Sequence, residues 1–166
     1  MAAAIVGAVA TMRRRGPYRP PWPHEVAALD DLAHALARGD AAAATRVGQR
    51  LGLAATAADD ALVLHSDPGT ERAWLVVVGR PGIAPASVVE VPHPNADLDT
   101  EKIGLGVRLR SPATLYLQAG AHRVAGAPPD ACRRGDFPAD VAARPDAPFA
   151  RLAAVLAGRG LPQIQL

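Results

Sequence analysis

The chain has 166 residues and a formal net charge of +2, and 49% of its residues are hydrophobic and 20% charged. This length fits one domain, and this composition excludes a wholly disordered chain. The longest apolar run covers the first eleven residues, which is too short for a spanning helix of roughly 20 residues. We therefore expect no integral membrane span. A single cysteine, Cys132, excludes an internal disulfide and a multi-cysteine zinc site.

The basic character of the chain does not indicate nucleic-acid binding. The sequence pI is about 9.2, but the arginines are spread along the chain and only Arg13, Arg14 and Arg15 form a run. Aromatic residues make up 4% of the sequence, so no surface interleaves basic with aromatic side chains. We therefore expect no nucleic-acid partner.

Residues 1–23 are expected to form a disordered or extended segment outside the fold, and residues 24–166 a single domain. The segment begins with small apolar residues, and its arginine run and prolines follow them. A secretory signal places its positive charge first. The segment leaves cytosol and export open, and we take the cytoplasm as the expected location. A membrane-surface or anchoring role for this segment is the alternative.

Apolar residues at helical spacing predict helices over residues 24–52, 98–109 and 149–156. The first of these is interrupted at Gly39 and Asp40 and ends at Gly52, which is a typical C-terminal cap. Residues 124–148 are rich in proline and charge and are expected to form a loop.

Short runs rich in β-branched or alternating apolar residues predict strands. These runs are Ala61–His65, Ala73–Gly79, Ser87–Val91, Thr114–Gln118 and Pro162–Leu166. Strands that alternate with helices are typical of the α/β class, here a mostly parallel or mixed sheet with flanking helices and an N-terminal helical segment. The closing strand stands at the end of the chain, which leaves open whether the fold is complete there.

Two histidines, His93 and His122, each follow a predicted strand. The carboxyl ends of parallel strands meet at one edge of a sheet, where α/β proteins place their active sites. The connection of about 28 residues between the histidines contains one predicted helix and fits a right-handed crossover. We therefore expect both imidazoles at one edge of the sheet.

His93, Asp97 and His122 form a candidate catalytic zinc site, because two histidines and one carboxylate leave a fourth position for water. Prolines on both sides of His93 stiffen its loop. In a helix that begins near Asp97, Glu101 would share a face with that carboxylate.

Glu101, or else Glu90, is the candidate base that activates the water, and Arg123 is the candidate group that binds an anion beside His122. Each residue also has a simpler explanation. Asp97 could cap a helix N-terminus, His93 could bond to a loop carbonyl, and His122 with Arg123 could be a solvated strand end.

The segment 73–166 resembles a family of bacterial zinc-dependent hydrolases. The resemblance rests on the runs VVEVPHPNADLDTEKIGL and TLYLQAGAHR, on Asp140-Val141-Ala142 with Phe149, and on the closing PQIQL. The family lies near the N-formylglutamate amidohydrolase and poly-γ-glutamate hydrolase group and is similar to zinc carboxypeptidases in fold.

The resemblance implies that His93, Asp97 and His122 bind zinc and that Arg123 binds a substrate carboxylate. The implied function is metal-dependent hydrolysis of amide bonds in small carboxylate-bearing molecules. Two departures favour the alternative, an inactive or truncated relative with a binding or structural role: Ala143 stands where a histidine is expected, and the chain stops at Leu166. No feature predicts an oligomeric state.

Overall fold

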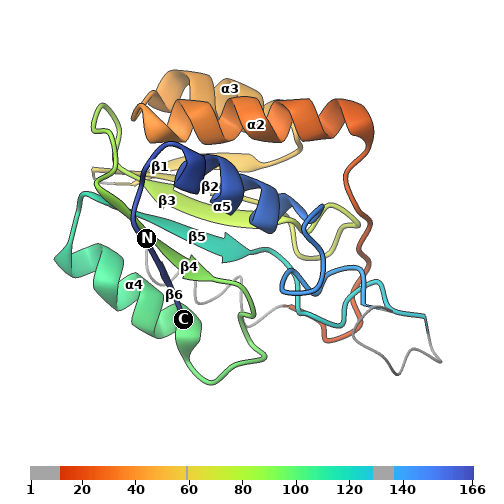
Figure 1. Ribbon diagram of the computed structural model, residues 1–166. Helices are drawn as coiled ribbons and strands as arrows, with labels where there is room; N and C mark the ends of the chain where they lie inside the picture. Colours follow the sequence, from red (N-terminus) through yellow and green to blue (C-terminus); the bar gives the residue numbers. More distant parts are fainter. Residues whose placement is uncertain (1–11, 59, 129–136) are drawn as a thin grey trace.

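The computed structural model describes residues 12–58, 60–128 and 137–166. Within this part of the chain, six strands form one sheet in the order β1-β2-β3-β5-β4-β6, with helices on both faces (Figure 1). The strands are β1 (Ala54–Ala58), β2 (Ala61–His65), β3 (Leu75–Gly79), β4 (Ser87–Val91), β5 (Thr114–Ala119) and β6 (Gln163–Gln165). The helices are α2 (Pro23–Ala37), α3 (Ala41–Arg50), α4 (Thr100–Arg110) and α5 (Pro148–Gly158).

The sheet is mixed, which confirms the predicted α/β class. Strands β4, β5 and β6 are parallel to one another, whereas β1, β2, β3 and β5 are joined by antiparallel pairing. The described residues of the links from β1 to β2 and from β2 to β3 form no helix, as is typical of links between antiparallel neighbours. Strand β1 has no counterpart among the predicted strands, because its sequence AATAA is alanine-rich and lacks β-branched residues apart from Thr56.

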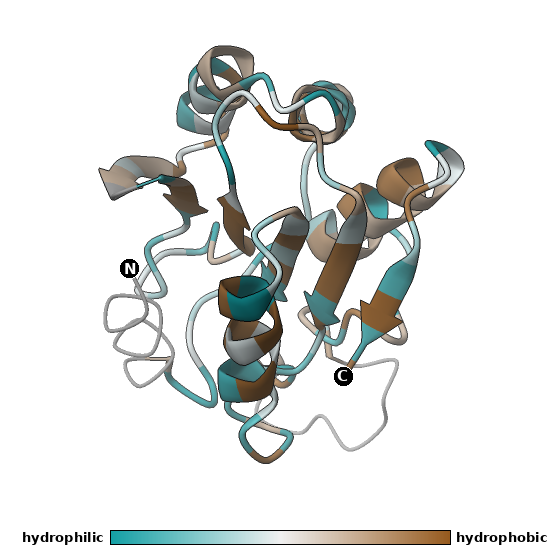
Figure 2. Cartoon of the chain, turned by 90° about the vertical axis from the view of Figure 1, so that its left-hand side faces the viewer, coloured by the Kyte–Doolittle hydropathy of each residue, from teal (hydrophilic) through white to brown (hydrophobic). Residues whose placement is uncertain are grey.

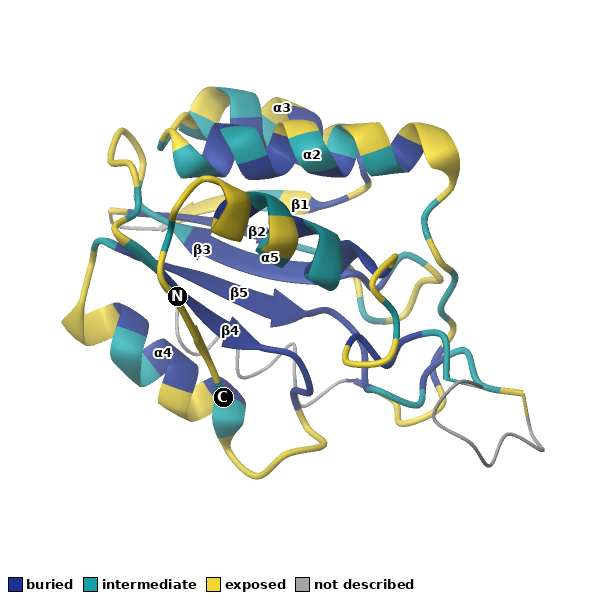
Figure 3. Ribbon diagram, viewed as in Figure 1, coloured by how far each residue is buried: buried dark blue, intermediate teal, exposed yellow. Residues whose placement is uncertain are grey.

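Helices α2, α3 and α5 cover one face of the sheet, and α4 covers the other face over β4 and β5 (Figure 1). The larger apolar core lies under α2, α3 and α5 and includes Leu29, Leu64 and Leu152. The smaller core lies on the face of α4 and includes Val89 and Tyr116. Strands β3 and β5 are buried throughout most of their length (Figure 3), and their apolar residues dominate the centre of the molecule (Figure 2).

Two close contacts fix the helices against their neighbours. Arg151 of α5 donates two hydrogen bonds to the Asp30 carboxylate of α2, at 2.6 and 2.5 Å. On the opposite face, a Cβ added to Gly104 of α4 would lie 2.9 Å from the Tyr116 ring and 2.9 Å from a Val91 methyl group. A glycine at this position therefore lets α4 lie close to the sheet.

Residues 12–22 contain a turn at residues 14–15 and no helix or strand, and they belong to the fold, which corrects for this part the expectation that residues 1–23 lie outside it. The Arg19 amide donates to the Glu71 carbonyl at 2.8 Å, and the Trp74 indole donates to the Arg19 carbonyl at 2.8 Å. The Arg19 guanidinium lies 3.9 Å from the centre of the Trp22 ring. Arginine and tryptophan side chains hold this proline-rich segment in place. Residues 1–11 and Cys132 lie outside the described residues.

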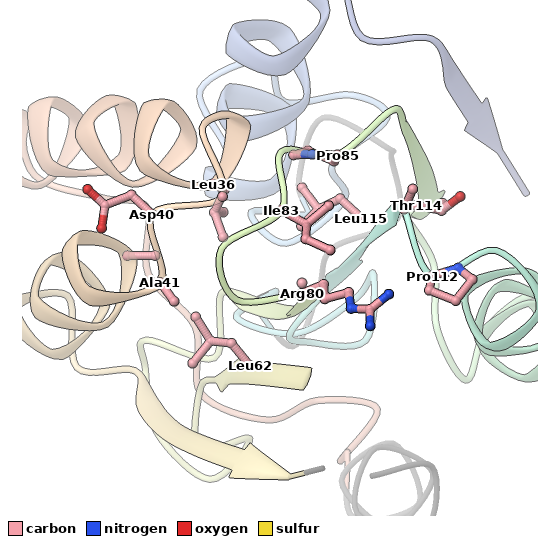
Figure 4. A pocket seen from close by; sticks show the side chains of 14 residues that line it. Leu36, Asp40, Ala41, Leu62, Arg80, Ile83, Pro85, Pro112, Thr114 and Leu115 are labelled. Atoms are coloured by element: carbon pink, nitrogen blue, oxygen red, sulfur yellow. The ribbon is translucent and has the colours of Figure 1, made fainter. Parts of the chain in front are cut away.

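An apolar pocket lies where the α2–α3 turn meets the β3–β4 turn (Figure 4). Its volume is about 20 Å³, about that of one water molecule. This pocket is therefore too small for a metabolite. Among the described residues, no helix combines the length and the apolar character needed to cross a membrane.

Candidate functional site

His93 and His122 emerge at the same edge of the sheet, as predicted. Strands β4 and β5 are parallel neighbours, with Val91 opposite Gln118, and α4 is the connection between them. Each histidine follows its strand by two or three residues and is buried. The two histidines therefore lie at the carboxyl ends of the parallel strands, where α/β proteins typically place their active sites.

His93 contacts a carboxylate at each ring nitrogen. Its Nδ1 lies 3.2 Å from Asp97 Oδ2, and its Nε2 lies 2.9 Å from Asp140 Oδ1. The second oxygen of Asp140 accepts a hydrogen bond from Arg123 Nη2 at 3.2 Å. Asp140 is fully buried, with 0% exposure, and its carboxylate joins His93 to Arg123. We call Asp97, His93, Asp140, Arg123 and His122 the strand-end cluster.

Each ring nitrogen of His93 faces a carboxylate oxygen, and a neutral imidazole cannot donate a hydrogen bond to both. A neutral ring donates through one nitrogen only. When Nε2 donates to Asp140, the lone pair of Nδ1 faces the Asp97 carboxylate, and the contact is repulsive. A second proton on the ring or a cation between Nδ1 and Asp97 removes this repulsion. This edge of His93 is therefore suited to a proton or a metal ion.

Asp97 reaches His93 from a turn and not from a helix. The Asp97 and Ala96 amides donate to the His93 carbonyl, at 3.1 and 3.2 Å, and α4 begins only at Thr100 with Asp99 at its N-cap. The expectation that Asp97 and Glu101 share a helix face is therefore wrong, as is the alternative that Asp97 caps the helix. The turn between them separates the two carboxylates.

The His122 ring is placed next to the others but is turned toward the backbone. Its Nδ1 accepts a hydrogen bond from the Val124 amide at 3.3 Å. The pKa of His122 is lowered, first by burial and then by electrostatic interaction with Arg14, Arg123 and His93. A neutral ring that accepts at Nδ1 carries its proton on Nε2.

The predicted zinc ligands are therefore only partly assembled. His93 Nδ1 and Asp97 are adjacent, whereas His122 directs Nδ1 at Val124. Within residues 12–58, 60–128 and 137–166, no group of three or more His, Cys, Asp or Glu side chains is arranged to hold a metal ion. The donor chemistry at His93 and Asp97 suits a cation, and His122 would have to exchange its backbone contact to join them.

Glu90 and Glu101, the two candidate bases, lie on opposite faces of the sheet. Glu90 alternates with the β4 residues that face α4, so its side chain shares the face of Val88 in the larger core. Glu101 lies on α4, one turn before Leu105 of the smaller core. Both are buried, and Glu90 Oε1 and Glu101 Oε2 have no hydrogen-bond partner among the described atoms. Burial raises the pKa of Glu90.

Positive charge surrounds His122. Arg14 and Arg123 both act on it electrostatically, and the side chain of Arg123 is 25% exposed. A hollow of about 510 Å³ lies beside this region, and the described residues that line it are Arg14, Arg15, Val124 and Phe137. Its size is in the range of small-molecule pockets. The arrangement can therefore attract an anionic small molecule.

Sequence reasoning missed two residues of this region, Arg14 and Asp140. Arg14 belongs to the segment that was expected to lie outside the fold. Asp140 belongs to the motif Asp140-Val141-Ala142 on which the family resemblance partly rests, and this was the available signal. A pairing across 47 positions leaves no local pattern in the sequence.

Comparison of the chain with protein-family models, with curated proteins and with solved structures finds no match in any of the three.

Proposed function

We propose that the strand-end cluster binds a small carboxylate-bearing molecule and that the chain acts on it as a metal-dependent amidohydrolase. The observation that carries this proposal is the chain of contacts Asp97–His93–Asp140–Arg123. The imidazole of His93 and the guanidinium of Arg123 contact the two oxygens of the buried Asp140 carboxylate, and the other ring nitrogen of His93 faces Asp97. The resemblance of residues 73–166 to zinc-dependent hydrolases points to the same chemistry.

His93 and Asp97 would hold the metal ion, and His122 would complete the ligand set after its Nδ1 leaves the Val124 amide. A bound zinc ion supplies a water of lowered pKa and polarises a carbonyl. Asp140 would accept the proton on Nε2 of His93 and so leave Nδ1 available for the metal ion. Asp140 is buried and contacts His93 and Arg123, and these contacts support a role in orienting the imidazole ring.

Arg123 would recognise the carboxylate of the substrate. Asp140 occupies one of its nitrogens, and an arginine fork has further donors for a second carboxylate. The neighbouring Arg14 adds to the positive potential around His122. These charges favour an N-acyl amino acid or a γ-glutamyl peptide over a neutral amide.

The second candidate function is binding without hydrolysis. It is favoured by the placement of Glu90 and Glu101, since neither carboxylate forms a hydrogen bond with the strand-end cluster among the described residues. Ala143, at the position where the family pattern predicts a histidine, favours the same alternative.

The experiment is a pair of assays on the zinc-loaded chain with N-acetyl-L-glutamate. Calorimetry measures binding, and release of free glutamate measures hydrolysis. We expect Arg123→Met to weaken binding by about tenfold or more, as for the loss of a charged hydrogen bond. Arg159→Met, an exposed arginine at the end of α5, is the matched control.

Binding together with glutamate release supports the hydrolase. Binding without release supports the second candidate function. Absence of binding, or binding that Arg123→Met leaves unchanged, contradicts both functions at this site.

A further inference from the structure

Arg108 is a buried arginine, and two of its guanidinium nitrogens have no hydrogen-bond partner in the part of the chain that the structure describes. It lies in the last turn of α4 and is 3% exposed. Its Nε and Nη2 atoms are buried, and neither has a partner. Together with Glu101, Gly104 and Leu105 it forms the buried face of the helix. Arginine is seldom buried to this extent without a paired anion.

The burial of the Arg108 guanidinium with two unpaired donors is unfavourable for the stability of the fold. Burial lowers its pKa, which shows that the surroundings disfavour the charge. A guanidinium does not lose its proton under physiological conditions, so the charge persists and requires compensation. Two unsatisfied donors that belong to one planar fork provide the geometry that binds two oxygens of an anion.

Two charged side chains act on Arg108 from the neighbouring turns. Asp60 attracts it and Arg80 repels it. Asp60 also forms an ion pair with Arg80, whose Nε lies 3.3 Å from Asp60 Oδ2. Among the described residues, the group contains two guanidinium groups and one carboxylate, which leaves an excess of one positive charge. The side chains of Arg80 and Asp60 are 38% and 63% exposed, so the group reaches the surface.

This group lies at the end of the sheet opposite the strand-end cluster. Arg80 follows the end of β3, and β3 is antiparallel to β5, with Leu75 opposite Ala119. The last residues of β3 are therefore at the start of β5, away from His122. Arg108, near the C-terminus of the crossover helix α4, lies at the same end as Arg80, which agrees with their electrostatic interaction.

We propose that Arg80 and Arg108 form a binding site for a small oxyanion, with phosphate as the simplest ligand. The oxyanion accepts the free donors of Arg108 and neutralises the excess charge of the group. Arg80, which is partly exposed, forms the entrance and competes with Asp60 for the ligand. The site is independent of the proposed hydrolase function and of any metal ion.

The test is thermal unfolding of the full chain in sodium phosphate and in sodium chloride at equal ionic strength and pH. At a phosphate concentration far above the dissociation constant, we expect the Tm of the wild type to rise by roughly 5 °C relative to chloride. Arg108→Met removes the charge and keeps an apolar side chain of similar length. We expect this variant to lose the phosphate effect and to be at least as stable as the wild type in chloride.

Three further variants make the result specific. Arg110→Met, an exposed arginine on the same helix, should keep the full phosphate effect. Arg123→Met tests whether phosphate acts at the strand-end cluster instead. Arg80→Met, a partly exposed position, should reduce it and serves if Arg108→Met fails to fold. The proposal is overturned if phosphate gives no more stabilisation than chloride, if Arg108→Met or Arg80→Met keeps the full effect, or if Arg123→Met abolishes it.

Discussion

His93 Nε2 lies 2.9 Å from Asp140 Oδ1, although the two residues are 47 positions apart in the chain. His93 follows β4, and Asp140 belongs to the loop before α5. Both side chains are buried. The contact fixes which nitrogen of the imidazole faces Asp97, and it therefore decides what the strand-end cluster can bind.

Asp140→Ala should change the tautomer of His93. When the wild-type ring is neutral, we expect its proton on Nε2, because Asp140 Oδ1 is the nearer acceptor at 2.9 Å, against 3.2 Å for Asp97 Oδ2. Without Asp140, we expect the proton on Nδ1, where Asp97 is the remaining acceptor. Long-range ¹H–¹⁵N NMR of the His93 ring measures this directly. Asp146→Ala, which removes the exposed partner of Arg144, is the control, and an unchanged tautomer in Asp140→Ala would show that the contact does not orient the ring.

Gly39 and Gly82 should respond differently to alanine, although both have positive φ angles of 67° and 74°. A Cβ at Gly39 would lie 2.4 Å from the Ile83 carbonyl carbon, whereas a Cβ at Gly82 meets nothing within 4 Å. Gly82→Ala carries only the cost of the left-handed backbone, about 1 kcal/mol. Gly39→Ala adds a clash with backbone and should cost about 3 kcal/mol or more. Urea unfolding of the two variants measures the difference, and equal costs would refute this close approach of the two turns.

Glu25 should make the fold sensitive to acid. Hydrogen bonds from Arg19 are the main reason that its pKa is lowered to about 2, against 4.5 for the free side chain. A carboxyl whose pKa is lower in the folded state stabilises the fold above its unfolded pKa, and this stability is lost as the pH falls from about 4.5 toward 2. The contribution is at most about 3 kcal/mol.

Urea unfolding between pH 2 and pH 7 checks this sign. Glu25→Gln should be less stable than the wild type at pH 7 and should show a smaller loss of stability below pH 4.5. Glu71→Gln removes a 60% exposed partner of the same arginine, and its acid profile should follow that of the wild type. A Glu25→Gln variant with the full wild-type acid dependence would rule out this role for Glu25.

The parts of the fold that the sequence predicted are those with a strong local pattern. The apolar runs of β2, β3, β4 and β5 and the helical periodicity of α4 were sufficient for the α/β class and for the crossover that brings His93 and His122 together. The alanine-rich strand β1 lacks such a pattern. Strand β1 forms because its backbone pairs with β2, and its own side chains show no strand pattern.

The parts that were not predicted depend on contacts between distant segments. Proline and arginine are typical of extended or disordered tails, yet Arg19 contacts Trp74 and Glu71 across more than 50 positions. Asp140 reaches His93 in the same way. Helix α4 begins at Thr100, two residues after the predicted start at residue 98. Asp97 lies in the turn before the helix, where its carboxylate contacts His93.

The most direct test of the proposed function is the zinc content of the purified chain, measured by plasma mass spectrometry after loading with zinc and removal of the excess. His93→Ala and His122→Ala are measured alongside, with His24→Ala at the exposed start of α2 as the control. We predict about one zinc per chain in the wild type and in His24→Ala, and loss of zinc in the other two variants. A wild type that retains no zinc, or variants of His93 and His122 that retain it in full, would contradict a metal-dependent hydrolase at the strand-end cluster.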